Sequence, residues 1–188
     1  MAYKFFNDVV AKEILVKHEL NKHGGSYKLL EKIRRGGVGL GGFKYINGVP
    51  EVDKRRKYTD TIVVNFEWLR NGFVIRFRNV EFHSMVLCKL DAIHKIELQK
   101  DYDVIQFSKR SLFRFFYNRG LNYESARMFG TPKELRRIGK IVLKITIGEH
   151  EMVFQNMEGF TEKSSKFFKE SPVNNRYLED LNAYKIIS

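Results

Sequence analysis

The spacing of apolar residues changes along this 188-residue chain, and the first 35 residues show a helical period. Apolar pairs recur near helical spacing at positions 5/6, 9/10 and 15/16. Gly24 and Gly25 can end the first helix, Ser26 can cap a second, and Gly36 can end that one. The pattern therefore predicts two N-terminal helices. A glycine-rich stretch (34–48) and a polar run to residue 57 follow them.

From residue 58 to residue 108 the period changes to two, which is typical of strands with one buried face. Five runs carry the alternation: TIVVNFEWL, FVIRFR, VEFHSMVLC, AIHKIELQ and DVIQFS. Asn71-Gly72 joins the first two as a hairpin turn, because both residues tolerate a positive φ. This region is predicted to be an antiparallel meander of about five strands.

Residues 109–140 interrupt that rhythm, and sheet and helix signals then alternate to the end of the chain. SLFRFFY is compatible with a strand or a helical turn, whereas TPKELRRIG predicts a helix with Thr131 as its N-cap. IVLKITI and EMVFQNM form a predicted hairpin around Gly148-Glu149. TEKSSKFFKES and NRYLEDLNAYKII predict two final helices, with Tyr177, Leu178, Leu181 and Tyr184 on one side of the second.

We therefore predict an α+β fold. It is an antiparallel, partly closed β-barrel or strongly bent sheet of about seven strands, with N-terminal helices and C-terminal helices.

The stretch FVIRFRNVEFHSMVLCKLDAIHKIELQ resembles the central strands of bacterial pleckstrin-homology-like (PH-like) and GRAM-type domains. In those families a hairpin precedes a strand with apolar residues at every third position, here Leu90, Ile93 and Ile96. The final hairpin and the KSSKFF helix resemble their C-terminal helix, which closes one end of the barrel. The resemblance covers residues 58–170 and implies binding of lipid headgroups or peptides without catalysis. It supplies no individual binding residue, and it has no counterpart for residues 109–140 or the N-terminal helices.

These signals divide the chain into three parts. Residues 1–57 form an N-terminal helical arm with a glycine-rich connector. Residues 58–170 form a β-rich PH-like domain with an insertion at 109–140, and residues 171–188 form a C-terminal helix.

Charge adds the strongest functional signal, because the net charge of +12 is unevenly distributed. Residues 1–57 carry 13 Lys and Arg against 6 Asp and Glu, and residues 109–145 carry 10 against 2, while the remaining segments are slightly acidic. Two basic blocks favour a face that meets a polyanion. The alternative is chance clustering on a solvated surface.

Several features indicate a cytoplasmic protein. No apolar run approaches the roughly 20 residues of a membrane-spanning helix. Asp8 and Glu13 interrupt the N-terminal stretch where a signal peptide would be apolar. Cys88 is the single cysteine, so no intramolecular disulfide forms, and its apolar surroundings predict a buried, inert thiol.

The glycine-rich stretch satisfies G-x-G-x-x-G from Gly37 to Gly42, which is the pattern of a dinucleotide-binding loop. That loop must follow a strand and open a helix, whereas this one follows a predicted helix and leads into FKYINGVPE. We interpret it as a flexible connector. The alternatives are a nucleotide cradle and an arm that orders when a partner binds.

No catalytic or metal site is predicted, and no cofactor. The five histidines lack partners at ligand spacing. A nuclease is the enzymatic alternative, because strand acids such as Asp91, Glu97 and Asp101 can gather around Mg²⁺. Glu97 and Lys100 are three residues apart, however, which places them on opposite faces of a strand. We expect a binding module with no small-molecule substrate.

The candidate site combines cations with the aromatic residues Phe113, Phe115, Phe116, Tyr117 and Tyr123. Cations meet phosphates and aromatic faces stack on bases, although the alternative for the three phenylalanines is a position in the core, with the arginines extending outward. The predicted polyanion-binding residues are Lys109, Arg110, Arg114, Arg119, Arg127, Lys133, Arg136, Arg137 and Lys140, helped by Lys54, Arg55, Arg56 and Lys57. Nucleic acid is the first expected partner and an anionic membrane surface the second. The third reading is a protein–protein interaction subunit that binds a partner through its N-terminal helices.

Overall fold

A computed structural model describes residues 2–9, 12–28, 31, 39–57, 61–101, 103–106, 111–129, 135–137, 139–156, 161–181 and 184–187. The chain forms two units. Unit 1 comprises Met1–Gln99 and Ile141–Asp180, and unit 2 comprises Lys100–Lys140 and Leu181–Ser188.

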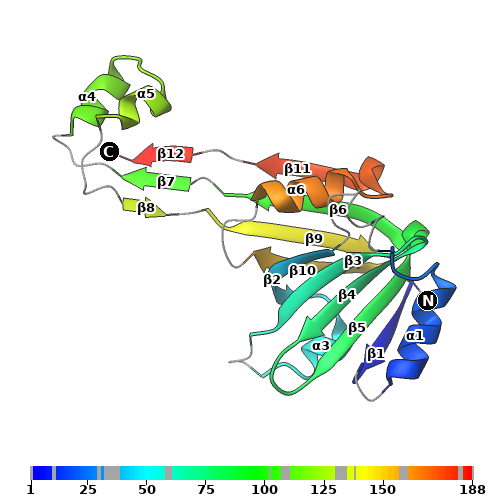
Figure 1. The fold of residues 1–188 in the computed structure, drawn as a ribbon. Helices are drawn as coiled ribbons and strands as arrows, with labels where there is room; N and C mark the ends of the chain where they lie inside the picture. Colours follow the sequence, from blue (N-terminus) through cyan, green and yellow to red (C-terminus); the bar gives the residue numbers. More distant parts are fainter. Residues whose placement is uncertain are drawn as a thin grey trace. The chain divides into compact units, whose positions relative to one another are not determined.

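Unit 1 is built on a sheet that has nine strands within the described residues (Figure 1). From edge to edge they are β1 (Tyr3–Asn7), β5 (His83–Lys89), β4 (Gly72–Arg78), β3 (Val63–Trp68), β2 (Gly39–Asn47), β10 (His150–Asn156), β9 (Ile141–Ile147), β6 (Ile93–Lys100) and β11 (Tyr177–Leu181).

Most neighbouring strands in this sheet are antiparallel. β3, β4 and β5 form a meander in which Phe66 lies opposite Ile75, and Ile75 lies opposite Val86. β2 joins this meander to the β9–β10 hairpin, because it pairs with β3 on one side and β10 on the other. The arrows of β6 and β11 point the same way in Figure 1, so the sheet is mixed.

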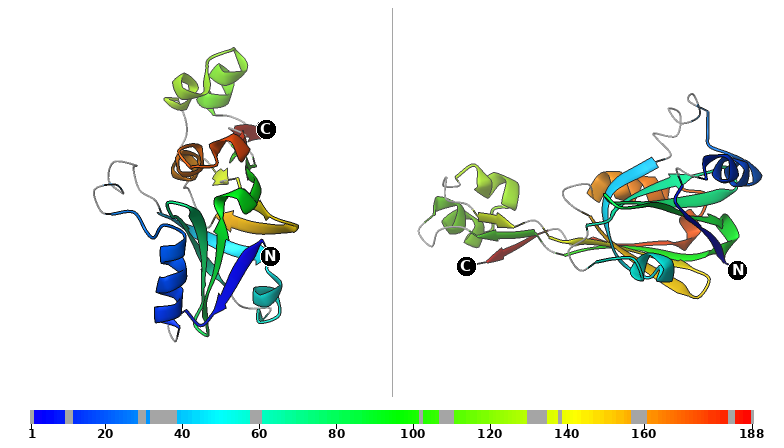
Figure 2. Two further views of the ribbon diagram at one scale, coloured as in Figure 1. Left: turned by 90° about the vertical axis from the view of Figure 1, so that its right-hand side faces the viewer. Right: turned by 90° about the horizontal axis from the view of Figure 1, so that it is seen from below.

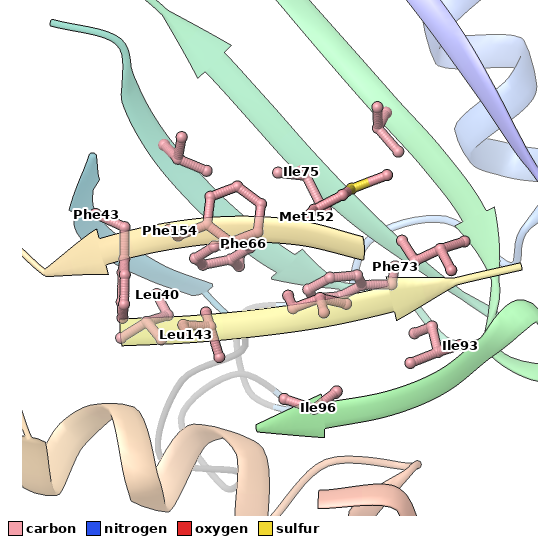
Figure 3. Packing of buried hydrophobic residues seen from close by; sticks show 14 of the residues in the cluster. Leu40, Phe43, Phe66, Phe73, Ile75, Ile93, Ile96, Leu143, Met152 and Phe154 are labelled. Carbon is pink, nitrogen blue, oxygen red and sulfur yellow. The ribbon is translucent and has the colours of Figure 1, made fainter. Parts of the chain in front are cut away.

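The main core lies on one face of this sheet and is rich in phenylalanine (Figure 3). Alternate residues of each strand enter it because successive strand side chains point to opposite faces. Phe66 stacks on Phe73 at 5.9 Å and meets Phe154 edge-on at 5.0 Å between ring centroids. Helix α6 (Thr161–Lys169) contributes Phe167 and Phe168 to this core, close to the Trp68 ring.

A smaller core lies on the opposite face, under helix α1 (Glu13–Lys22). Phe6 of β1, Val16 of α1 and Met85 of β5 are among its buried residues. The left view in Figure 2 shows α1 beside β5 and β1. β1 therefore contributes apolar side chains to both faces of the sheet.

Helix α3 (Pro50–Asp53) follows β2 directly, and Tyr45 of β2 holds it in place. The buried Tyr45 hydroxyl donates to Asp53 Oδ1 at 2.8 Å and accepts from the Val49 backbone N–H at 2.6 Å. Burial raises the pKa of this hydroxyl. Gly48, between β2 and α3, adopts a φ of +106° beside the β10 backbone.

Unit 2 contains a second sheet and two short helices. β12 (Tyr184–Ile187) pairs in parallel with β7 (Asp103–Gln106), which pairs antiparallel with β8 (Leu135–Arg137). The helices are α4 (Leu112–Asn118) and α5 (Tyr123–Arg127). Phe113 and Ala126 form a small buried core between them, with Tyr117 and Leu121 packed against it.

The predicted fold class is wrong. The protein is mostly sheet, with nine strands in a mixed sheet that is not closed into a barrel, and its described α-helices are five short ones. The count of about seven strands missed the segments whose strand conformation depends on distant partners.

Both ends of the chain account for most of the difference. Residues 3–7, predicted to begin a helix, form β1, because Tyr3 and Phe5 pack on one face while Phe6 packs on the other. The predicted C-terminal helix is instead β11 and β12, which pair with β6 and β7. The predicted helix TPKELRRIG contains strand β8 at Leu135–Arg137. In the glycine-rich stretch, residues 34–38 lie outside the described residues and residues 39–47 form β2.

Other predictions are confirmed. The hairpin at Asn71-Gly72 joins β3 to β4, the turn at Gly148 joins β9 to β10, and α6 follows them as expected. The five predicted strands between 58 and 108 correspond to β3–β7, although β6 does not pair with β5 and β7 belongs to the second sheet. Among the described helices, none is long and apolar enough to cross a membrane.

Candidate functional site

The first predicted cation cluster, Lys54–Lys57, directly follows α3 in unit 1, and the fold engages most of its charges. An Arg55 Nη1 donates to the Asn7 side-chain oxygen, and an Arg56 Nη1 donates to the Ile46 carbonyl oxygen. Lys57 Nζ lies 2.6 Å from Glu81 Oε1. Lys54 is exposed.

Carboxylates also surround this cluster. A hollow of about 300 Å³ beside Arg55 is lined by Asp8, Glu81 and His83 as well. Both side chains of the Lys57–Glu81 ion pair are exposed, so the pair is weak, and a strongly charged ligand could displace Glu81 from Lys57. The neighbouring acids give this cluster a mixed charge, which suits a polyanion less well than the sequence alone indicated.

The second predicted cluster lies in unit 2, where two helix caps define the local structure. The Ser111 hydroxyl accepts from the Arg114 backbone N–H at 3.3 Å and caps α4. The Asn122 side chain accepts from the Ser125 N–H at 2.8 Å and caps α5. The Phe113 N–H donates to the Phe129 carbonyl at 3.1 Å, which ties the two helices together.

The outward side of this helix pair exposes large apolar side chains next to arginine. Leu112 is 60% exposed, Phe115 48%, Met128 85% and Phe129 42%. The Arg119 guanidinium lies 4.3 Å from the centroid of the Phe115 ring. We call this surface the aromatic–arginine patch, and it comprises Leu112, Phe115, Phe116, Arg119, Arg127, Met128 and Phe129.

Ring contacts connect the patch from α4 to the turn after α5. Phe115 meets Phe116 edge-on at 5.3 Å, and Phe116 lies 4.4 Å from Phe129 between ring centroids. Leu112 and Phe115 of α4 and Arg119, the residue that directly follows this helix, are separated by three and four positions, which is helical spacing. A helix exposing apolar and cationic residues on one side has a surface suited to a ligand with both apolar and anionic parts.

The structure brings only some of the predicted site residues together. Arg119 and Arg127 are exposed in the patch, Arg114 is half-buried, and Lys140 is exposed, with its carbonyl accepting from the Asp101 N–H at 2.9 Å. The backbones of Arg136 and Arg137 lie in β8. Lys109, Arg110 and Lys133 lie outside the described residues. Lys54–Lys57 belong to the other unit.

The aromatic part of the prediction divides in the same way. Phe113 is fully buried and stacks on Tyr117 at 5.6 Å, so it is core, whereas Phe115 is available at the surface. The sequence interpretation did not include Leu112, Met128 and Phe129 in the site. For Leu112 a signal exists in SLFRFFY, because Leu112 and Phe115 are three positions apart and share one side if this run is a helix.

Unit 2 concentrates positive charge. Its residues hold 11 Lys and Arg against 4 Asp and Glu, a net charge of +7 out of the total of +12. Unit 2 makes up about a quarter of the chain, so its charge density exceeds that of unit 1. A field of one sign attracts polyanions and raises their association rate.

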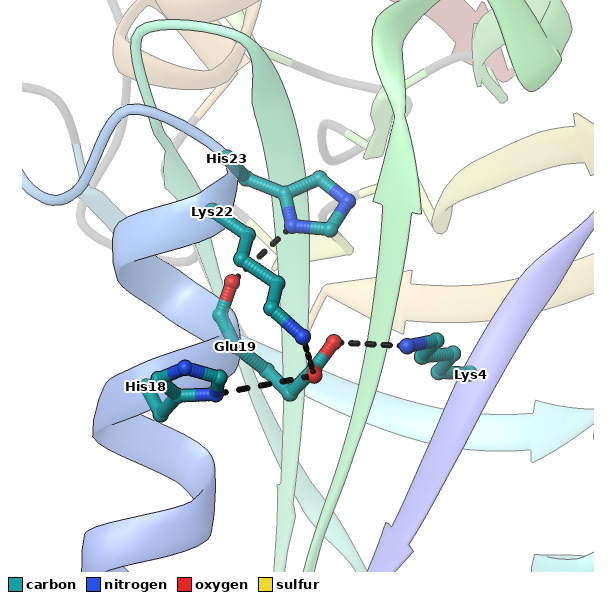
Figure 4. Close-up of polar contacts among 5 residues, drawn as sticks. All are labelled: Lys4, His18, Glu19, Lys22 and His23. Carbon is teal, nitrogen blue, oxygen red and sulfur yellow. Dashed lines mark hydrogen bonds and ion pairs between the residues drawn. The ribbon is translucent and has the colours of Figure 1, made fainter.

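A separate ionic cluster ties α1 to β1 (Figure 4). The nearly buried Glu19 carboxylate lies 2.6 Å from Lys4 Nζ and 2.8 Å from Lys22 Nζ, and the Nδ1 atom of His18 lies 3.9 Å away. Hydrogen bonds from Lys22 and Lys4 lower the pKa of Glu19 to about 2. The cluster crosslinks the edge strand to the helix that covers it.

A groove of about 740 Å³ runs along β1, and no sequence motif pointed to it. Its lining residues are Ala2, Tyr3, Lys4, Phe5, Phe6, Pro50, Glu51, Gly148, Glu149 and His150. The Tyr3 hydroxyl donates to Glu51 Oε2 at 3.4 Å, and its ring meets His150 edge-on at 5.3 Å. Burial and the neighbouring Glu51 raise the pKa of Tyr3 to about 12.

The described residues offer little for covalent or metal chemistry. Cys88 is buried with its Sγ 3.7 Å from the Phe73 carbonyl oxygen, and burial raises the pKa of this thiol to about 12. A thiol in that state is a poor nucleophile. Within the described ranges, no three His, Cys, Asp or Glu side chains gather closely enough to hold a metal ion.

No protein-family model, curated protein or solved structure matches this chain.

Proposed function

We propose that this protein is a non-catalytic module that binds a polyanion through the aromatic–arginine patch, with single-stranded nucleic acid as its first ligand. The proposal places it in the cytoplasm, where a single reduced cysteine such as Cys88 is usual.

The arrangement of Arg119 over Phe115 carries the proposal. An exposed ring provides a face on which a base can stack, and the adjacent guanidinium can reach the phosphate beside that base. Phe129 adds a second exposed ring in the same patch. Stacking of one base on an aromatic ring contributes about 1–3 kcal/mol, and it is tolerant of sequence.

The charge of unit 2 supports the same ligand. Nucleic-acid binding depends on the release of counterions from phosphates, so the net charge of +7 favours it and predicts a steep salt dependence. A duplex presents its bases edge-on in its grooves, whereas single strands expose base faces. The patch therefore favours single strands over duplexes.

The test is fluorescence anisotropy with a short labelled single-stranded RNA of mixed sequence, titrated with the full chain between about 50 and 200 mM salt. We expect Phe115→Ala to weaken binding by about tenfold or more, because a stacking surface is lost. Arg119→Lys keeps the charge but loses the flat guanidinium, so it should fall between the wild type and Arg119→Ala. Replacing Arg136 and Arg137 by alanine should reduce the salt slope.

Arg78→Ala is the matched control, because Arg78 is an exposed arginine in β4 of unit 1. It should bind like the wild type. Unchanged binding by both Phe115→Ala and Arg119→Ala, or an affinity that does not respond to salt, would contradict the proposal.

A second candidate function is docking to an anionic membrane surface. Two observations favour it. Leu112 and Met128 are exposed aliphatic side chains in the patch, and these can enter an acyl layer but cannot stack on bases. The proposed relationship to PH-like and GRAM-type domains also supports it, since the β9–β10 hairpin precedes α6, and Ile93 and Ile96 of β6 are fully buried.

Vesicle co-sedimentation separates these candidates. Binding to vesicles with phosphatidylserine but not to neutral vesicles, reduced by Leu112→Ser with Met128→Ser, would favour the membrane surface. Binding to RNA that is unchanged by this double substitution would favour nucleic acid. A protein that binds neither, but elutes in a larger complex from its native lysate, would be an interaction subunit.

A further inference from the structure

The edge of the nine-stranded sheet at β1 is open to a further strand. β1 stands last in the strand order and, among the described residues, pairs with β5 alone. Because the backbone groups of a strand alternate in direction, about half of those in β1 point away from β5. Such a row of N–H and C=O groups can pair with another extended chain.

The groove along this edge has the dimensions of a strand site. Five consecutive residues, Ala2 to Phe6, line one side, while α3 and the β9–β10 turn line the other. The left view in Figure 2 shows β1 with α1 on one side and α3 on the other. Its volume of about 740 Å³ lies within the usual range of ligand pockets.

Contacts at both ends define the length of the groove. Asn7, at the end of β1, accepts a hydrogen bond from Arg55. At the other end, Gly148 is so close to Ala2 that an added Cβ would lie 2.5 Å from the Ala2 Cβ. The span between them is five residues of β1, or roughly 17 Å of extended chain.

The charges of the groove are opposite to those of the whole protein. Its acids are Glu51 and Glu149, and neither forms an ion pair with another described residue. Its one lysine, Lys4, is already paired with Glu19 at 2.6 Å. Phe5 and Pro50 add apolar walls between the charged positions. An occupant with cationic side chains and some apolar ones would complement this lining.

We propose that this groove binds an extended, basic segment of a partner protein, which adds to β1 as a tenth strand. The main chain of the segment pairs with the outward backbone groups of β1, and its cationic side chains lie near Glu51 and Glu149. The groove residues belong to unit 1 and the aromatic–arginine patch belongs to unit 2. The acids of the groove also repel a polyanion.

The test uses two pools of short peptides with the immobilised full chain. Both pools alternate a charged residue with Val, Thr, Ile, Phe or Tyr, and the charged residue is lysine in one pool and glutamate in the other. We expect at least tenfold enrichment of the lysine pool over the glutamate pool. A selected lysine peptide should also slow hydrogen exchange of β1 amides, as an added strand requires.

Two variants and two modified peptides complete the design. Glu51→Gln with Glu149→Gln should reduce affinity for the selected peptide by about tenfold or more, while Glu162→Gln on α6 should leave it unchanged. Two versions of the peptide are N-methylated at alternate peptide bonds, one at the odd and one at the even positions, which removes the main-chain donors on one edge of the added strand. The version that loses the donors facing β1 should not bind. The proposal is wrong if neither pool is enriched, if the glutamine variants bind as well as the wild type, or if both N-methylated peptides still bind.

The peptide experiment tests the groove independently of the polyanion proposal. Phe115→Ala should weaken RNA binding without affecting the peptide, and the glutamine variants should do the opposite.

Discussion

At the scale of single residues, Glu19 combines burial with charge at the junction of α1 and β1. Only 6% of the residue is exposed, yet two lysine ammonium groups lie within 2.8 Å of its carboxylate. A buried carboxylate without such partners would be strongly destabilising. The lysines keep it ionised, which makes the junction sensitive to acid.

We predict that Glu19→Gln removes part of the acid sensitivity of unit 1. The pKa of Glu19 is about 2 in the folded protein and 4.5 ordinarily, so its contribution is fully present above about pH 4.5 and is lost as the pH falls toward 2. Trp68 is the single tryptophan and is buried in the main core, so its fluorescence during urea unfolding reports on unit 1. The variant should be less stable than the wild type at pH 7, and the difference should shrink toward pH 2.

Glu13→Gln provides the control, because Glu13 is exposed in the first turn of the same helix. Its stability should follow the wild type closely at each pH. A Glu19→Gln deficit that is equally large at pH 7 and pH 2 would rule out the ionised cluster as its cause.

The residue scale also shows what the sequence could reveal about the candidate site. Composition alone identified a basic, aromatic segment. It could not separate Phe113, which is core, from Phe115, which is exposed, because adjacent residues exchange roles when a strand is replaced by a helix. A helix over residues 112–118 places Leu112, Phe115 and the following Arg119 on one side of that helix.

At the scale of elements, the connection between β2 and α3 depends on backbone space at Gly48. A Cβ at this position would lie 2.0 Å from the Glu151 carbonyl oxygen and 2.7 Å from the Met152 Cα, both in the β10 backbone. Its φ of +106° also belongs to the region that side chains avoid. Glycine therefore permits the close approach of β2 and β10.

We predict that Gly48→Ala destabilises unit 1 by about 3 kcal/mol or more, since neither backbone can move without disrupting strand pairing. Gly39→Ala in the same strand is the control. Its added Cβ would meet only the Phe66 carbonyl at 3.7 Å, an ordinary contact, so its effect should stay below about 1 kcal/mol. Urea unfolding followed by Trp68 fluorescence compares them, and equal effects would contradict the explanation.

Elements that depend on local turns were predictable, and those that depend on distant partners were not. Asn71-Gly72 and Gly148 specify hairpins within a few residues. β1 is a strand because β5 pairs with it, with Tyr3 opposite Cys88, and its three aromatic positions also fit a helical period. Tyr177, Leu178 and Leu181 likewise fit a helical period, so the sequence predicted a helix where the structure has β11.

At the scale of the whole molecule, the described cores of the two units differ greatly in size. Among the described side chains, unit 1 contains the large phenylalanine-rich cluster, whereas the α4–α5 core of unit 2 comprises Phe113 and Ala126 with two partly buried neighbours. Charge summed along the sequence could not indicate this division, because unit 2 is assembled from two separate segments. The candidate patch therefore lies beside the smaller of these described cores.

We predict that the units open separately. Amides of α4 and α5 should exchange with solvent at least about tenfold faster than interior amides of β3 and β4, because local opening of a small core requires less free energy. Native-state hydrogen exchange measured by mass spectrometry checks this prediction. Equal protection in both units, lost together as urea is added, would indicate one cooperative structure.

The central position of β2 affects how the protein emerges from the ribosome. β2 pairs with β3 soon after synthesis, but its other neighbour, β10, begins at residue 150, about a hundred residues later. Until β10 is synthesised, β2 is an edge strand of the nascent sheet, and its unpaired backbone groups can pair with another chain. Chaperones that shield this intermediate would be most useful in that interval, and a chain stalled before residue 150 would be prone to aggregate.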